Sequence, residues 1–87
     1  MAAYKIEWKR SAKKEIEKLP RQIAARIVRA ITKLTNNPHP DGAHKLAGSE
    51  QTYRIRMGDY RVLYSVYGDQ LMVEIIRVKH RKDVYKR

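Results

Sequence analysis

Three arginines close together in the sequence are the residues whose type and spacing could do chemistry in this chain. Arg54 and Arg56 stand two positions apart, and Arg61 follows the dipeptide Gly58–Asp59. Glycine at the first position of a two-residue loop is typical of a type II′ hairpin turn, which would place Arg56 directly opposite Arg61. Like charges in that position destabilise a sheet, and a bound anion relieves the repulsion. Because guanidinium binds phosphate through two hydrogen bonds, we expect a phosphate site.

A second group of candidate residues lies in the basic C-terminal stretch, residues 77–87, which contains six Lys and Arg. His80 carries an imidazole that titrates near neutrality, and the phenol of Tyr85 can stack on a base. This stretch follows a predicted strand beside the one that carries Arg61. We therefore expect His80, Arg81 and Tyr85 to fold back toward Arg61. The predicted phosphate- or RNA-binding residues are Arg54, Arg56, Lys79 and Lys82.

Composition limits what the chain can be. Its 87 residues contain 20 Lys and Arg against 9 Asp and Glu, a net charge of +11, which predicts one domain, 1–87, with a polyanionic partner. It has no cysteine, and three histidines without clustered acids make a poor metal site, so we expect no metal and no cofactor. Without an apolar stretch of membrane-spanning or signal-peptide type, a cytoplasmic protein with no membrane partner is expected.

The apolar spacing predicts an α+β fold with the element order β-α-α-β-β-β. Alternation over residues 4–8 indicates a short strand, and helical spacing indicates helices over 12–19 and from Pro20 to about Thr35, with Ser11 as the first helix cap. Residues 51–57, 60–67 and 70–79 are typical of strands, separated by two Gly-Asp turns. We expect two helices packed on a mainly antiparallel sheet, followed by a short basic segment.

The predicted register divides the strand residues between two faces of the sheet. The second turn, Gly68–Asp69, would place Val66 opposite Leu71 and Glu74 diagonal to Arg61. Val78 and His80 would join the arginine face if the last strand runs straight. The predicted core face comprises Tyr53, Ile55, Met57, Tyr60, Val62, Tyr64, Val66, Leu71, Val73 and Ile75.

Four motifs and the order of the elements are shared with a known family. The motifs are Leu46-Ala47-Gly48, Tyr53-Arg54-Ile55-Arg56, Gly58-Asp59-Tyr60-Arg61-Val62-Leu63-Tyr64 and the ending His80-Arg81-Lys82-Asp83-Val84-Tyr85. Together they resemble the RelE/ParE toxin superfamily, and the RelE branch most. The resemblance extends over essentially the whole chain. It implies a toxin of a type II toxin–antitoxin system that cleaves messenger RNA (mRNA) in the ribosomal A site, with the mRNA, the ribosome and a cognate RelB-like antitoxin as partners.

The resemblance also implies roles for individual residues. Arg61 would stabilise charge on the scissile phosphate, and Tyr85 would stack on or orient the substrate. Either Arg81 or His80 would lie near the leaving 5′-oxygen as general acid. The identity of the general base stays open at this point.

Arg54 and Arg56 occupy positions where studied family members carry lysines, one of them proposed as the base. A guanidinium stays protonated at ordinary pH, so both arginines suit phosphate binding better than proton transfer. His80 and Glu74 are the remaining candidates for the base.

The predicted mechanism is metal-independent attack of the 2′-OH on the adjacent phosphorus, because cationic side chains are present and an acid cluster for Mg²⁺ is not. Two alternatives stay open. One is a ParE-like poison of DNA gyrase without nuclease activity. The other is a non-catalytic basic domain that binds RNA or the ribosome.

Overall fold

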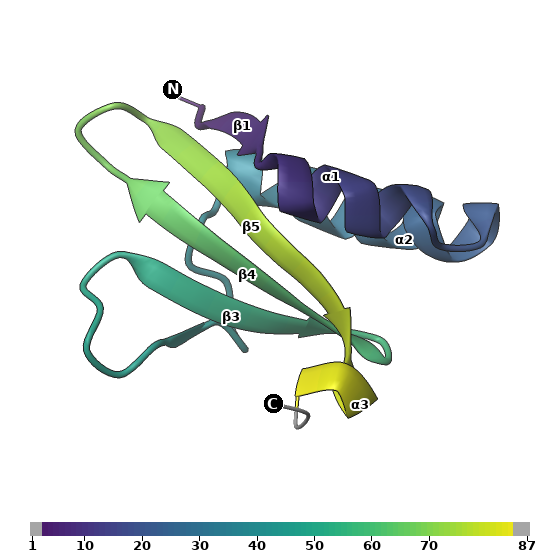
Figure 1. Ribbon diagram of the computed structural model, residues 1–87. Coiled ribbons are helices and arrows are strands. Elements are labelled where there is room, and N and C mark those ends of the chain that lie inside the picture. Colours follow the sequence, from purple (N-terminus) through teal and green to yellow (C-terminus); the bar gives the residue numbers. More distant parts are fainter. Residues whose placement is uncertain (1–2, 85–87) are drawn as a thin grey trace.

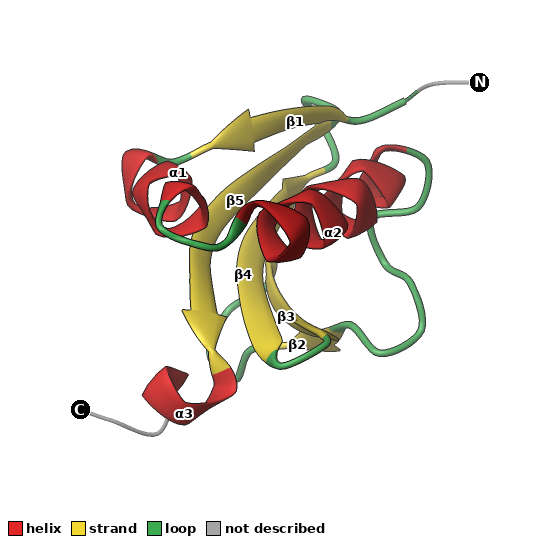
Figure 2. Cartoon of the chain, turned by 90° about the vertical axis from the view of Figure 1, so that its right-hand side faces the viewer, coloured by secondary structure: helices red, strands yellow, loops and turns green. Residues whose placement is uncertain are grey.

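The structure, a computed structural model, describes residues 3–84. Its sheet has the strand order β1-β5-β4-β3-β2, and β1 pairs with β5 in parallel while the other pairs are antiparallel. Helices α1 and α2 lie on one face of this sheet (Figures 1 and 2). The α+β prediction is therefore confirmed. The elements are β1 (Lys5–Trp8), α1 (Arg10–Glu17), α2 (Arg21–Thr32), the 3-10 turn η1 (Lys33–Thr35), β2 (His44–Lys45), β3 (Thr52–Met57), β4 (Tyr60–Tyr67), β5 (Met72–His80) and α3 (Arg81–Val84).

The core forms where the apolar stripe of α2 and η1 meets the covered face of the sheet. Tyr53 and its apolar neighbours on β3 are partly buried against this core. The prediction that Leu71 lies in the core is wrong, since Leu71 is 39% exposed. The buried apolar residues are Ala12, Ile27, Ile31, Leu34, Val62, Tyr64, Val66, Val73, Ile75 and Val78.

Helix α1 begins earlier than predicted. The backbone N–H of Lys9 donates to the carbonyl of Ile75, so the chain leaves β1 and enters the helix at Arg10. Ser11 consequently lies inside the first turn and does not cap the helix. Its hydroxyl instead donates to the carbonyl of Ile76, at 2.8 Å. The predicted cap is wrong because Ser11 faces β5.

The first hairpin has the predicted register. Met57 pairs with Tyr60 across Gly58–Asp59, and Gly58 has a φ of 63°. A positive φ at the first loop position is what a type II′ turn requires, and glycine adopts it without steric cost. The turn therefore has the predicted length of two residues, and Arg56 stands opposite Arg61.

The second hairpin differs from its prediction. Tyr67 pairs with Met72, so the loop has four residues, 68–71, where two were expected. The N–H of Leu71 donates to the carbonyl of Gly68, and Leu71 itself takes the positive φ of 50°. Val66 consequently faces Val73 and not Leu71. The shift of two residues leaves the same side chains of β5 on the core face.

A bulge in β5 then changes which face its last residues occupy. Tyr64 pairs with Ile75 but Leu63 pairs with Arg77, so Ile76 is an extra residue. The bulge turns Val78 into the core, where it is 3% exposed, and places Arg77 on the other face. Without it, alternation would point Arg77 at the core, and burying a charge there is costly. The prediction that Val78 lies on the arginine face is wrong for this reason.

Candidate functional site

The face of the sheet opposite α1 and α2, here called the open face, carries a row of three cationic residues. Arg56 on β3, Arg61 on β4 and Lys79 on β5 stand opposite one another across three adjacent strands. A β-sheet places such neighbours about 5 Å apart at their Cα atoms. The first hairpin turn sets the register between β3 and β4, and the bulge in β5 sets the register between β4 and β5 at this point. Together they bring the three residues into one row.

A second row of the open face lies next to the first. Arg54 stands opposite Leu63, which in turn stands opposite Arg77. Arg54 is exposed, whereas Leu63 is only half-buried. The open face therefore combines cationic groups, which suit phosphates, with an apolar residue between them.

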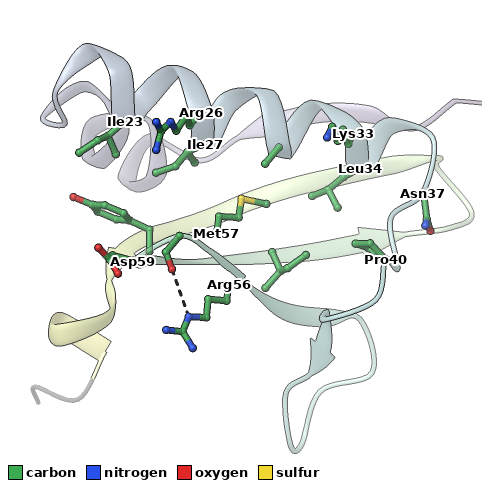
Figure 3. A pocket seen from close by; sticks show the side chains of 14 residues that line it. Ile23, Arg26, Ile27, Lys33, Leu34, Asn37, Pro40, Arg56, Met57 and Asp59 are labelled. Atoms are coloured by element: carbon green, nitrogen blue, oxygen red, sulfur yellow. Dashed lines mark hydrogen bonds between the residues drawn. The ribbon is translucent and has the colours of Figure 1, made fainter.

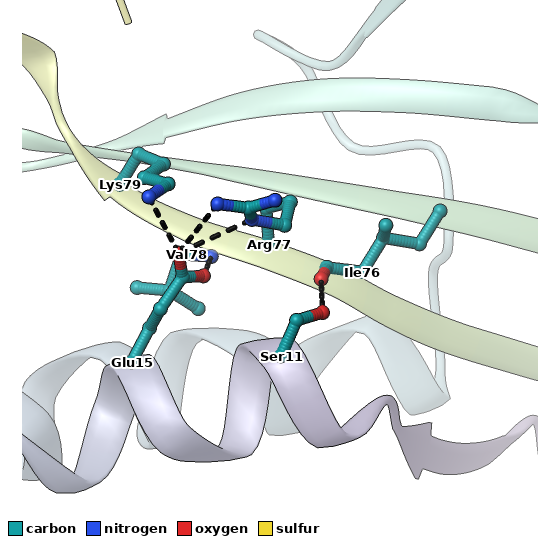
Figure 4. Close-up of polar contacts among 6 residues, drawn as sticks. All are labelled: Ser11, Glu15, Ile76, Arg77, Val78 and Lys79. Carbon is teal, nitrogen blue, oxygen red and sulfur yellow. Dashed lines mark hydrogen bonds and ion pairs between the residues drawn. The ribbon is translucent and has the colours of Figure 1, made fainter. Parts of the chain in front are cut away.

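Glu15 on α1 is the polar residue that the sequence analysis missed. One carboxylate oxygen accepts the backbone N–H of Val78 at 2.7 Å, and the other binds Arg77 at 3.1 Å and Lys79 at 2.8 Å (Figure 4). Burial alone would raise the pKa of this carboxyl, but the bonds from Lys79, Val78 and Arg77 outweigh it and lower the pKa. Glu15 is thus a charged carboxylate at neutral pH.

His80 is not on the face where it was expected. It pairs with Tyr60, whose ring it meets edge-on with centroids 5.1 Å apart, and alternation puts both on the face opposite Arg61. Its Nδ1 accepts the backbone N–H of Lys82 at 3.1 Å. In the neutral ring the proton is therefore on Nε2. The bulge in β5 explains this correction, as it does for Val78.

Arg81 lies beside the turn that joins the two arginine-bearing strands. Its backbone N–H donates to the carbonyl of Asp59 at 2.8 Å, which holds the start of α3 at this turn. The side chains of Arg81 and Lys82 are exposed. Tyr85 lies outside the described residues, so its predicted place near Arg61 stays a prediction.

Glu74 is distant from Arg61, contrary to the predicted register. It stands opposite Ser65, four residues along β4 from Arg61, which corresponds to about 13 Å. Its carboxylate accepts a hydrogen bond from the Tyr67 hydroxyl at 3.4 Å. The four-residue loop causes the difference, and Glu74 neither offsets the arginine charge nor suits the role of base.

A groove of about 710 Å³ lies on the other side of the sheet, between α2 and the β3–β4 hairpin (Figure 3). Its floor is apolar and includes Ile23, Ile27 and Met57, while Arg26 and Arg56 stand at its margin. The Nε of Arg56 donates to the carbonyl of Gly58 at 3.4 Å. Arg56 therefore borders both the open face and the groove.

Neither a metal site nor a membrane span is found in the described part of the chain. Its His, Asp and Glu side chains form no group of three or more that could hold a metal ion. None of its helices has the length and apolar character needed to cross a membrane.

Comparison with known proteins identifies the family. The family model described as the ParE toxin of the type II toxin–antitoxin system parDE matches residues 6–85. This chain belongs to the RelE/ParE toxin superfamily. One relative in this superfamily is Toxin RelG of Mycobacterium tuberculosis, 35% identical over 97% of this chain and 98% of that protein.

Solved structures of the RelE/ParE superfamily share the fold. The toxin–antitoxin complex RelBE2 from Mycobacterium tuberculosis contains a chain with a TM-score of 0.80 and 30% identity, over 92% of this chain and 100% of that one. The archaeal RelE–RelB complex from Pyrococcus horikoshii gives a TM-score of 0.80 and 30% identity, over 90% and 94%. These matches confirm the family resemblance, and the roles of individual site residues stay predictions.

Proposed function

We propose that this RelE-family toxin is an endoribonuclease that cleaves mRNA in the ribosomal A site and so inhibits translation. The observation that carries the proposal is the pair Arg56 and Arg61, which stand opposite each other on the open face. Like charges opposite one another are unfavourable in the free sheet. A phosphodiester bound there would turn this unfavourable arrangement into a set of charge-assisted hydrogen bonds.

The chemistry would be attack by the ribose 2′-OH on the adjacent phosphorus. A bond from O2′ to phosphorus forms, the bond from phosphorus to O5′ breaks, and the proton of the 2′-OH leaves while O5′ gains one. The products are a 2′,3′-cyclic phosphate and a 5′-OH. Arg61, central in the row, would stabilise the negative charge that develops on the phosphoryl oxygens. The position of Arg81 at the β3–β4 turn favours it over His80 as the group near O5′.

The decisive experiment replaces Arg61 with alanine. Loss of one preorganised charge-stabilising group lowers a rate by about 10²–10³, so we expect Arg61→Ala to lose most cleavage and growth arrest while remaining folded. Primer extension on mRNA bound to programmed ribosomes measures the cleavage, and circular dichroism checks the fold.

Arg29→Ala is the matched control, since Arg29 is exposed on α2 and its replacement changes the net charge equally. We expect this variant to cleave as the wild type does. A folded Arg61→Ala protein with wild-type cleavage would overturn the assignment. DNA breaks and an SOS response without cut mRNA would indicate a gyrase poison, and ribosome binding without cleavage would indicate a non-catalytic binding domain.

We further propose an antitoxin as the protein partner, as in the RelE–RelB complexes to which the chain is similar. Such a partner would carry acidic groups for the cationic open face and apolar groups for the half-buried Leu63, Met72 and Ile76. Co-expression with the cognate antitoxin should restore growth and yield a stable complex.

A further inference from the structure

The outer edge of β5 is completed by side chains of α1. Strand β1 pairs with β5 only from Met72 to Ile75. Beyond that point Ser11 donates to the carbonyl of Ile76, and Glu15 accepts the N–H of Val78 (Figure 4). Ser11 and Glu15, which lie one helical turn apart on α1, thus make the hydrogen bonds to the β5 backbone that a longer β1 would have made.

The same carboxylate of Glu15 holds two cations of the open-face rows. Its second oxygen lies 2.8 Å from Nζ of Lys79, and 3.1 Å from both Nε and Nη2 of Arg77. The Glu15 side chain is 17% exposed, against 38% for Lys79 and 42% for Arg77. The anion is therefore the least accessible member of the cluster.

These contacts matter because Lys79 stands opposite Arg61. A carboxylate offers a guanidinium and an ammonium the same pattern of charged oxygens as a phosphate does. While Glu15 occupies Lys79 and Arg77, neither is free to neutralise a phosphate of bound RNA.

We propose that Glu15 is a positioning residue that withholds Lys79 and Arg77 from RNA, so that neither side chain contributes a phosphate contact on the open face. This inference rests on the proposed function, because it assumes that RNA binds the open face. It also assigns Lys79 a different role from the phosphate contact that the sequence predicted. The protein consequently binds RNA with fewer cations than its composition offers.

The salt dependence of RNA binding tests this inference. The probe is a single-stranded 2′-O-methyl RNA oligonucleotide, which has no free 2′-OH and cannot be cleaved by the proposed reaction. In Glu15→Gln the amide oxygen still accepts the N–H of Val78, but the charge is gone. Each cation that is freed to contact a phosphate steepens the slope of log K against log salt by about 0.7. We expect a slope steeper by about 0.7–1.4 and tighter binding at low salt.

Glu17→Gln is the matched control, since Glu17 is exposed on the same helix and the charge change is equal. We expect it to leave the slope unchanged. Adding Lys79→Ala should reduce the slope by about 0.7 in the Glu15→Gln background and leave it almost unchanged in the wild type. This dependence on background separates withheld charge from a loss of folding, which circular dichroism follows separately.

Equal slopes for Glu15→Gln and Glu17→Gln would overturn the inference. So would a Lys79→Ala substitution in the wild type that lowers the slope by about 0.7, a result that does not require Glu15→Gln to fold. If the wild type cleaves mRNA on ribosomes while either result is found, the proposed function stands and only the role of Glu15 falls. If neither the wild type nor Glu15→Gln binds the oligonucleotide, the inference about Glu15 fails, whereas the proposed function is still judged by cleavage of mRNA on programmed ribosomes.

Discussion

Tyr64 illustrates how one buried polar group can be stabilised by a single partner. Its side chain is fully buried, its ring stacks on Tyr53 with centroids 5.8 Å apart, and its hydroxyl donates to the carbonyl of Pro38 at 2.8 Å. This bond holds the loop after η1 against the sheet. Burial raises the pKa of Tyr64 from 10.0 to about 12, and the neighbouring Tyr53 adds to the effect.

This raised pKa predicts a loss of stability at high pH. The folded protein keeps the phenol proton between pH 10 and about 12, where the unfolded chain releases it. The stabilising contribution is therefore complete below pH 10 and is lost as the pH rises toward 12. The loss corresponds to about 3 kcal/mol of unfolding free energy.

Urea unfolding of the wild type and Tyr64→Phe between pH 8 and pH 12 measures this effect. Below pH 10 the variant should be less stable by about 1–3 kcal/mol, because the Pro38 carbonyl loses its donor. The advantage of the wild type should shrink above pH 10, since phenylalanine does not titrate. A difference that stays constant up to pH 12 would contradict the assignment.

At the scale of elements, the β4–β5 loop carries a strained residue. Leu71 has a φ of 50° and is 39% exposed. The left-handed conformation costs a residue with a Cβ about 1–2 kcal/mol, and asparagine tolerates it better. Leu71→Asn should therefore stabilise the protein by about 1 kcal/mol, measured as a rise in the thermal unfolding midpoint.

Gln70→Asn provides the comparison for Leu71→Asn. Gln70 is exposed in the same loop, and its φ is not among the positive values of the described residues. We expect its substitution to change stability by less than about 0.5 kcal/mol. The strain argument fails if Leu71→Asn gives no gain over this control.

At the scale of the whole molecule, the net charge and the positions of the two candidate bases bear on the proposed cleavage of mRNA on the ribosome. The net charge is +11, which attracts the protein to a polyanion. Of the residues considered as base, Glu74 lies opposite Ser65 and His80 lies on the face away from Arg61. Under the proposed function, correct placement of the mRNA by the ribosome would then contribute much of the rate, as positioning can.

We therefore expect mRNA in the A site of programmed ribosomes to be cleaved at least about a hundredfold faster than the same mRNA free in solution. Primer extension with and without ribosomes compares the two rates at one salt concentration. Ribosomes that carry a different message serve as the control for non-specific effects. Equal rates for free and ribosome-bound mRNA would contradict this prediction.

The sequence by itself determined the fold class, the order of the main elements and the first hairpin register. These features depend on neighbours along the chain. Apolar spacing specifies a helix or strand, and Gly58 specifies a turn that only a few backbone conformations satisfy. For that reason the pairing of Arg56 with Arg61 could be predicted from the residues alone.

Only the tertiary structure decided where the last residues of β5 point and what holds them. The adjacent pair Ile75 and Ile76 breaks the strand alternation and was the available signal for the bulge, but its position depends on which side chains the core accepts. The contacts of Glu15 with Arg77 and Val78 join residues 62 and 63 positions apart. No local pattern specifies such contacts, because they exist only once β1 has ended and α1 lies along the remaining edge of β5.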